Sequence, residues 1–293
     1  MSAITAVAPP LPSARSGFWS RIDPRYLQAG LATTILVVGQ WKFGTIGGYD
    51  RLLTALVCAL GCETLFSLLI RKRWPAWPSV YISGLSVVIL TKPNPSSLAW
   101  PLSLWPFALT ALISITSKYV ITYRGRHLFN PTNFGLCMLL LLASDQVALL
   151  STQWGNAWGA LALIWGWGTL VVVRAKVLTI TLTYLLSFSA LAWVRTLVNG
   201  NSYINEVAPI TGPMLTLFMF FMVTDPAVVP SRQWARIAMT VAVALLECLF
   251  RLQNEWRLPG MDWVLMAPPM FAYFLIGPVT RWLDLHFAPR PSV

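Results

Sequence analysis

The chain has 293 residues, of which 56% are hydrophobic and 11% are charged, and its formal net charge is +11. Because about a quarter of the residues in a soluble domain are charged, this composition excludes an ordinary soluble protein and predicts one that lies in a lipid bilayer. A basic excess in such a chain is typical of membrane topology, so we expect no nucleic-acid partner.

Residues 1–25 contain no long apolar run, which distinguishes them from a secretory signal and predicts a cytoplasmic tail. Apolar segments follow, and most approach the length of about 20 residues that a transmembrane helix needs. They cover residues 26–42, 52–70, 77–90, 98–122, 131–149, 157–173, 177–194, 210–224, 235–250 and 263–276. The sequence therefore predicts an all-α polytopic membrane protein with about ten transmembrane helices.

These segments divide evenly between residues 26–150 and residues 151–280, which leaves 281–293 as a second cytoplasmic tail. Because an odd number of crossings reverses the side of entry, the two halves would form inverted five-helix repeats, with both termini cytoplasmic. Alternating spans place most of the 21 Lys and Arg residues on the inner side, as the positive-inside rule requires. We expect a multi-pass protein of a bacterial-type inner (cytoplasmic) membrane.

Glu63 lies in the middle of the second segment. An acidic residue there either serves a substrate or proton or makes a hydrogen bond that packs helices together. Both interpretations stay open. Lys118 and Asp225 lie near inner helix ends, where snorkelling to the membrane interface or helix capping is enough to explain a charged side chain.

Two apolar segments are short and end in similar sequences, T-K-P from Thr91 and T-D-P from Thr224. Proline-broken segments at matching positions of two halves are typical of binding sites in inverted-repeat transporters, because the broken backbone frees amide and carbonyl groups. We therefore expect Thr91, Thr224 and Asp225 to lie at one central site.

The fifth segment begins with a dense polar sequence that contains Asn130, Pro131, Thr132 and Asn133. Proline suits the first helical turn, and Asn130 can cap the unpaired N–H groups there. Capping leaves Thr132 and Asn133 unexplained, since polar side chains inside an apolar helix usually face a cavity or another helix. The alternatives are a capped helix start and a ligand-lining site at Asn130, Thr132 and Asn133.

The sequence contains no phosphate-binding glycine loop and no nucleophile with a base at a recognisable spacing. Its four cysteines all fall inside expected spans, which predicts buried thiols, although Cys58 and Cys62 share a helix face on which a metal or cluster is the alternative. We therefore expect no metal site and no catalytic residues. The chain is more typical of a protein that is not an enzyme by itself, although it could be a subunit of a redox-driven complex.

Two motifs resemble those of the RnfD and NqrB membrane subunits of ion-pumping electron-transport complexes. Phe129-Asn130-Pro131-Thr132 is similar to the F-N-P-A sequence of that family. The stretch from Thr211 to Pro226 resembles its S-G-A-T sequence followed by an apolar helix that ends in T-D-P. Similar proteins also occur alone and in enediyne biosynthesis clusters. The resemblance implies a helical membrane protein and, as partners, the lipid bilayer and membrane or soluble redox subunits.

The resemblance also implies a threonine esterified to FMN on the outer face. That position is Met214 or Leu215 in this sequence, depending on which motif the count starts from. Neither side chain can form a phosphoester, so we expect no covalent FMN unless Thr211 or Thr216 takes that role. A non-covalently bound flavin, FMN or riboflavin, stays open.

Three functions are compatible with these patterns. The first is a transporter or channel-like subunit for a small planar molecule such as a flavin, which the broken segments favour. The second is a membrane electron-transport subunit with non-covalent flavin, which the family resemblance favours. The third is a membrane scaffold for partner proteins. We favour the first on sequence alone.

Overall fold

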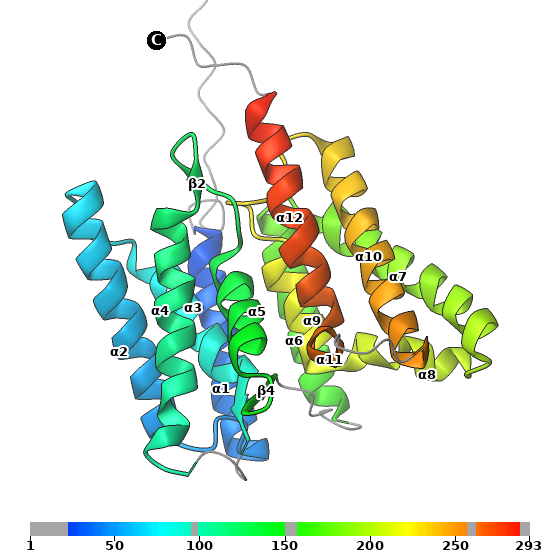
Figure 1. Cartoon of the computed structure of the whole chain (residues 1–293), viewed down its shortest axis with the longest axis horizontal. Helices are drawn as coiled ribbons and strands as arrows, with labels where there is room; N and C mark the ends of the chain where they lie inside the picture. The colour runs from blue at the N-terminus through cyan, green and yellow to red at the C-terminus, as the bar shows by residue number, and fades with distance from the viewer. Residues whose placement is uncertain (1–22, 95–98, 150–156, 257–261, 288–293) are drawn as a thin grey trace, which may run out of the picture.

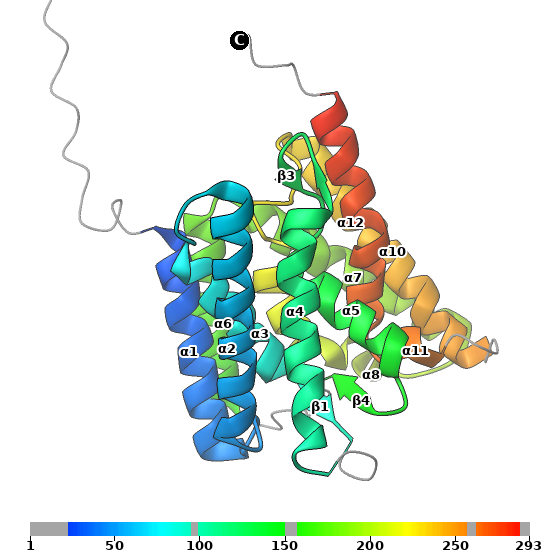
Figure 2. The ribbon, with the colours of Figure 1, turned by 60° about the vertical axis from the view of Figure 1, so that its left-hand side comes forward.

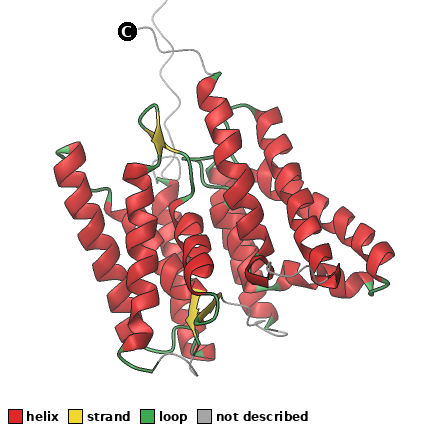
Figure 3. Cartoon of the chain, viewed as in Figure 1, coloured by secondary structure: helices red, strands yellow, loops and turns green. Residues whose placement is uncertain are grey.

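The computed structural model describes residues 23–94, 99–149, 157–256 and 262–287. Helices make up most of these residues, and the strands are few and short (Figure 1 and Figure 3). The prediction of a mainly helical protein is confirmed.

The first half of the chain contains five α-helices among its described residues, and the π-helix η2 (Ser67–Arg71) continues the second of them. They are α1 (Pro24–Phe43), α2 (Tyr49–Phe66), α3 (Trp77–Leu90), α4 (Trp105–Val120) and α5 (Pro131–Ala143). A short 3-10 helix, η3 (Leu102–Leu104), precedes α4.

The second half contains three long helices, α7 (Leu178–Asn199), α10 (Gln233–Trp256) and α12 (Pro268–His286), besides α6 (Trp158–Arg174). Shorter pieces lie between them, namely α8 (Tyr203–Val207), the 3-10 helix η4 (Ala208–Thr211), α9 (Pro213–Leu217), the π-helix η5 (Phe218–Met222) and α11 (Asp262–Leu265).

Four short strands, which the sequence did not lead us to expect, form two antiparallel ladders within the described residues. β1 (Thr91–Pro93) pairs with β4 (Val147–Leu149), with Lys92 opposite Ala148. β2 (Thr122–Tyr123) and β3 (Arg126–His127) form a hairpin between α4 and α5. The β1–β4 ladder gives hydrogen-bonding partners to the backbone where α3 ends, which a broken helix inside apolar surroundings requires.

Two described helices are long and apolar enough to cross a bilayer, Tyr49–Arg71, which combines α2 and η2, and Leu178–Asn199, which is α7. A third candidate is the pair Tyr203–Thr211 and Met214–Met222, whose two parts are bent by 60°. The apolar helices α3, α5 and α6 are shorter. Together these features support a membrane protein.

Helices of the two halves pack in a corresponding order. α2 packs on α4 and α4 on α5, while α7 packs on α10 and α10 on α12. Across the boundary, α1 contacts α6 and α5 contacts α12. In Figures 1 and 2 the first half, from blue to green, lies beside the second half, from yellow-green to red. The α4–α5 contact requires Gly135, because a Cβ atom there would lie 2.0 Å from Ser114 Oγ.

The C-terminal helix is longer than the sequence predicted. We expected the last span to end at 276 and a tail to begin at 281, but α12 continues to His286. Arg281 is 2% exposed, and its guanidinium donates to the carbonyl groups of Ala227 and Val229. Asp284 accepts from the backbone N–H of Ser231 at 3.1 Å. These contacts with the loop after η5 explain why the helix extends past its apolar segment.

Lys92 in β1 provides a test of the packing at the end of α3. Its ammonium donates to the Thr45 carbonyl, and burial, followed by repulsion from Arg51, lowers its pKa to about 8. The unfolded chain keeps this lysine protonated up to a pKa of about 10.4. Below pH 8 the folded protein therefore carries the full cost of this partly buried charge, and stability rises as the pH increases from about 8 to about 10.

We expect Lys92→Met to reduce this rise in thermal midpoint between pH 7 and pH 10. The pKa difference sets an upper limit of about 3 kcal/mol on the effect. Lys42→Met, which alters an exposed lysine at the end of α1, should leave the pH dependence unchanged. Equal slopes for the wild type and Lys92→Met would show that partial burial does not lower the pKa of Lys92.

Candidate functional site

A cavity of about 830 Å³ opens at the end of the helices where many of the basic residues gather. It lies between the start of α1, the end of η2, the start of α3, the start of α5, the α6–α7 turn and the end of η5. This is the end that carries the β2–β3 hairpin, at the top of Figures 1 and 2. We call it the main cavity.

The two family-like motifs meet in the main cavity. Asn130 Nδ2 donates to Asp225 Oδ2 at 3.0 Å, although the residues are 95 positions apart. The Asn130 Oδ1 atom accepts from the backbone N–H of Asn133 at 3.0 Å, so Asn130 also caps α5. Asp225 Oδ1 accepts from the N–H of Ala227. One amide therefore fixes both the start of α5 and the turn that follows η5.

A buried ion pair forms another part of the wall. Lys118 Nζ on α4 lies 2.7 Å from Glu63 Oε2 on α2, and the Tyr119 hydroxyl donates to Glu63 Oε1 at 3.0 Å. Glu63 is 3% exposed and Lys118 is 6% exposed. The Lys118 side chain does not extend to the surface as expected but is buried in an ion pair with Glu63 of the adjacent helix. Glu63 thus makes the helix-packing contact and lines the cavity at the same time.

Both π-helices of the described residues contribute to the main cavity. Ser67 and Arg71 come from η2, and Phe220 and Phe221 come from η5. π-Helical turns are rare and often lie at functional sites, because they displace side chains from a regular helical register. Here they place a guanidinium and two aromatic rings around the same space.

Charge in the main cavity favours anionic ligands, since cationic side chains outnumber acidic ones. The cationic residues are Arg25, Arg71, Arg73, Lys118, Arg174 and Lys176, and the acidic residues are Asp23, Glu63 and Asp225. His127 also lines the cavity. Burial lowers the pKa of His127 below its ordinary value, although the Asp225 carboxylate opposes this shift. His127 is therefore neutral near pH 7 and can donate one hydrogen bond and accept another.

Some of the sequence-predicted site residues line the main cavity and others do not. Glu63, Asn130, Thr132, Thr224 and Asp225 all line the main cavity. The Thr224 hydroxyl donates to the Phe220 carbonyl at 2.6 Å, so it contributes only acceptor capacity. The local sequence suggested these positions, but the structure was needed to show that Arg71, His127 and Lys118 line the same cavity, because they come from η2, β3 and α4.

The other predicted residues do not line this cavity. Thr91 is fully buried in β1, and Asn133 donates from Nδ2 to the Met270 carbonyl of α12 at 3.2 Å. Thr211 is exposed, whereas Thr216 is 1% exposed and donates to the Gly212 carbonyl. Past the aromatic wall of η5, a narrow void of about 20 Å³ continues along Leu90 and Leu217. The segment at Thr224 thus lines the main cavity and the one at Thr91 does not, so the structure does not bring the two broken segments together at this cavity.

Fold and cavity together define a helical membrane protein with a basic, partly aromatic cavity at one end. No family model matches the chain. The chain is 34% identical over 119 residues to the D subunit of the ion-translocating oxidoreductase complex of Aeromonas salmonicida (strain A449). The matched segment covers 40% of this chain and 31% of that protein, so the chain matches about a third of its relative's length. The match supports the resemblance to the RnfD-like family that the motifs predicted.

Proposed function

We propose that this chain is a membrane subunit of an ion-translocating electron-transport complex. The observation that carries the proposal is the match to the D subunit of an ion-translocating oxidoreductase complex. It is supported by the Asn130–Asp225 hydrogen bond, which joins the two motifs of the resemblance at a cavity wall. Other redox subunits of such a complex would be its partners.

We further propose that the main cavity binds a flavin without a covalent bond. Its volume of about 830 Å³ lies within the range of about 300 to 1,000 Å³ that is usual for small-molecule sites. Phe220 and Phe221 supply an aromatic wall, while His127 and Asn130 supply polar groups for a heterocycle. The arginines near the opening suit a phosphate. A flavin would supply reversible electron uptake, and the side chains of this chain would bind it, orient it and exclude water.

The outer motif disfavours a covalent FMN at each candidate position except Thr211. Met214 and Leu215 carry no hydroxyl, and the Thr216 hydroxyl is buried and already donates to Gly212. Thr211 is exposed, and its hydroxyl donates to the Ala208 carbonyl at 2.9 Å. Of the two threonines, only Thr211 therefore presents an accessible oxygen to an enzyme that would attach FMN.

The proposed topology has about ten crossings in two inverted halves with both termini in the cytoplasm of a bacterial-type cell. Support comes from the corresponding packing order of α2, α4 and α5 and of α7, α10 and α12. Contacts between α1 and α6, and between α5 and α12, join elements that occupy equivalent places in the two halves. Such self-equivalent contacts are expected near a pseudo-two-fold axis.

The transporter interpretation, which the sequence favoured, receives no support from the comparison. It rests on the broken segments, and the void that lies past the aromatic wall toward Leu90 measures about 20 Å³. Electron transport therefore becomes the preferred function, and transport of a small molecule or a scaffold role becomes an outcome to be tested.

Purified wild-type protein should be yellow, with flavin absorbance that is released on denaturation and no fluorescent band in a denaturing gel. Asn130→Leu should abolish the colour because it removes a polar group from the cavity wall. The loss of the cap should lower stability by about 0.5 to 2 kcal/mol. Thermal midpoint and absorbance are measured together, and Asp145→Asn, at an exposed turn, is the control.

Three results would contradict the proposal. A colourless wild-type protein that moves a substrate into vesicles would indicate transport, and a colourless protein that copurifies with a soluble partner would indicate a scaffold. A parallel collapse of colour and stability in Asn130→Leu would mean that Asn130 is only a helix cap.

A further inference from the structure

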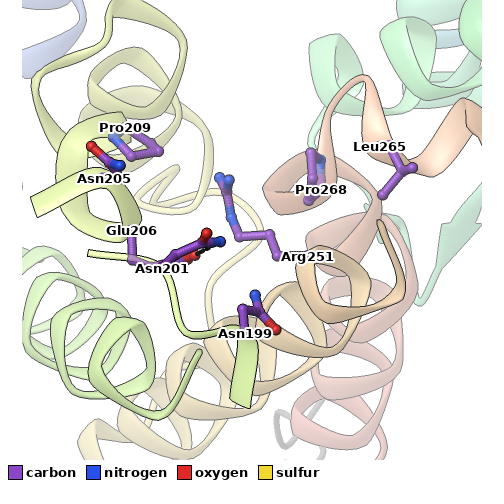
Figure 4. Close-up of a pocket in the computed structure, with 8 residues that line it drawn as sticks. All are labelled: Asn199, Asn201, Asn205, Glu206, Pro209, Arg251, Leu265 and Pro268. Carbon is purple, nitrogen blue, oxygen red and sulfur yellow. Dashed lines mark hydrogen bonds between the residues drawn. The ribbon is translucent and has the colours of Figure 1, made fainter. Parts of the chain in front are cut away.

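A second polar pocket lies at the opposite end of the helices from the main cavity. Its volume is about 330 Å³, and it lies between the end of α7, α8, α10, the end of α11 and the start of α12. Its lining residues are Asn199, Asn201, Asn205, Glu206, Pro209, Arg251, Leu265 and Pro268. Figure 4 shows the Arg251 side chain extending from α10 into the middle of this outer pocket.

The carboxylates beside the outer pocket already have partners. Glu206 accepts from Arg195 Nε at 2.6 Å and from Asn201 Nδ2 at 3.2 Å. Glu247 accepts from Arg251 Nε at 2.9 Å and from the Tyr184 hydroxyl. A cation would have to displace a guanidinium from one of these carboxylates. The pocket is therefore poorly suited to a cationic ligand.

Hydrogen-bond donors, in contrast, are in excess. A guanidinium carries five N–H groups. In Arg251 the Nε and Nη2 atoms both contact the Glu247 carboxylate. The side chains of Asn199 and Asn205 make no hydrogen bond within the described residues. Behind the wall, the buried Nη1 atom of Arg195 also lacks a partner in the described parts of the chain. An arginine surrounded by amide donors is the chemistry that binds oxyanions.

The surroundings suit a phosphate that belongs to a lipid. Trp193 and Leu197 near the end of α7 are 58% and 64% exposed, and Ile204 on α8 is 74% exposed. These apolar side chains lie within a few residues of the asparagines in the chain. The acyl chains of a lipid would cover these side chains while its phosphate enters the polar pocket. Trp193 suits this position, because tryptophans are enriched at the level of the lipid headgroups.

We propose that the outer pocket binds a phosphate group, carried by an anionic phospholipid headgroup or by a small soluble phosphate. Arg251 would supply the charge, and Asn199 and Asn205 would donate from either side. The site is separate from the main cavity, so the proposal does not depend on whether that cavity binds flavin.

The test uses the full-length protein purified in detergent, with inorganic phosphate and short-chain phosphatidylglycerol as probes and titration calorimetry as the measurement. We expect at least one probe to bind the wild type, and Asn205→Leu to weaken that binding about tenfold or more. Asn205→Leu leaves the Arg251–Glu247 pair intact, so the variant should fold. Arg232→Gln, an exposed arginine before the start of α10, is the matched control and should bind like the wild type.

Binding of phosphatidylglycerol alone would assign the site to a lipid headgroup, and binding of both probes would assign it to soluble phosphates. Failure of both probes to bind, or equal affinities for the wild type and Asn205→Leu, would overturn the proposal. Arg251→Gln is a second test variant. If the guanidinium holds the phosphate, this variant should bind the probe more weakly than Asn205→Leu does.

Discussion

Glu63→Leu is expected to lower the free energy of unfolding by about 3 to 5 kcal/mol, because it leaves the Lys118 ammonium buried without its counter-ion. The double variant Glu63→Leu/Lys118→Met should recover most of this loss, since replacing both members of a buried pair with apolar groups is often neutral or stabilising. Thermal and chemical unfolding in detergent would measure both effects. Asp145→Leu, at an exposed turn after α5, is the control and should change stability little.

The double variant also separates the two interpretations of Glu63. If the carboxylate only packs α2 against α4, the stable double variant should keep flavin binding and electron transfer. If Glu63 serves a ligand or proton in the main cavity, the double variant should fold and lose function. A double variant that is as unstable as Glu63→Leu would show that the pair is not the main contribution of these residues.

The membrane topology should give an all-or-none result. A reporter that fluoresces only in the cytoplasm should be bright when fused after Arg126, Lys176 or Val293 and dark after Asp145 or Asn201. Arg126 belongs to the β2–β3 hairpin and Lys176 lines the main cavity, at the basic end of the helices. Asp145 precedes β4 and Asn201 precedes α8, which lie toward the other end in Figure 1.

The reason for this expectation is electrostatic, because basic residues are retained on the cytoplasmic side. Cell fluorescence, normalised to the amount of each fusion protein, is the measurement. A bright fusion after Asn201 would place both ends of α7 on one side of the membrane, and the ten-span arrangement with its inverted halves would fail.

Composition and local pattern determine much of this protein. A chain with few charges and apolar segments of about 20 residues is expected to cross lipid as helices, because a helix of that length spans the bilayer and satisfies its backbone groups within its own segment. The capped start of α5 at Asn130 and the short third segment were likewise predictable, since capping and proline breaks depend on neighbours in sequence. The family resemblance also came from short motifs alone.

Tertiary structure decided which of these local features share a site. Asn130 is hydrogen-bonded to Asp225, which is 95 residues away in the sequence, and Lys118 to Glu63, which is 55 residues away. Thr91 lies apart from both pairs. No local pattern specifies such contacts, because they depend on which helix faces pack together and at what depth. The ladder at β1, the length of α12 and the outer pocket around Arg251 arise in the same way, from contacts between segments whose spacing in the sequence carries no signal.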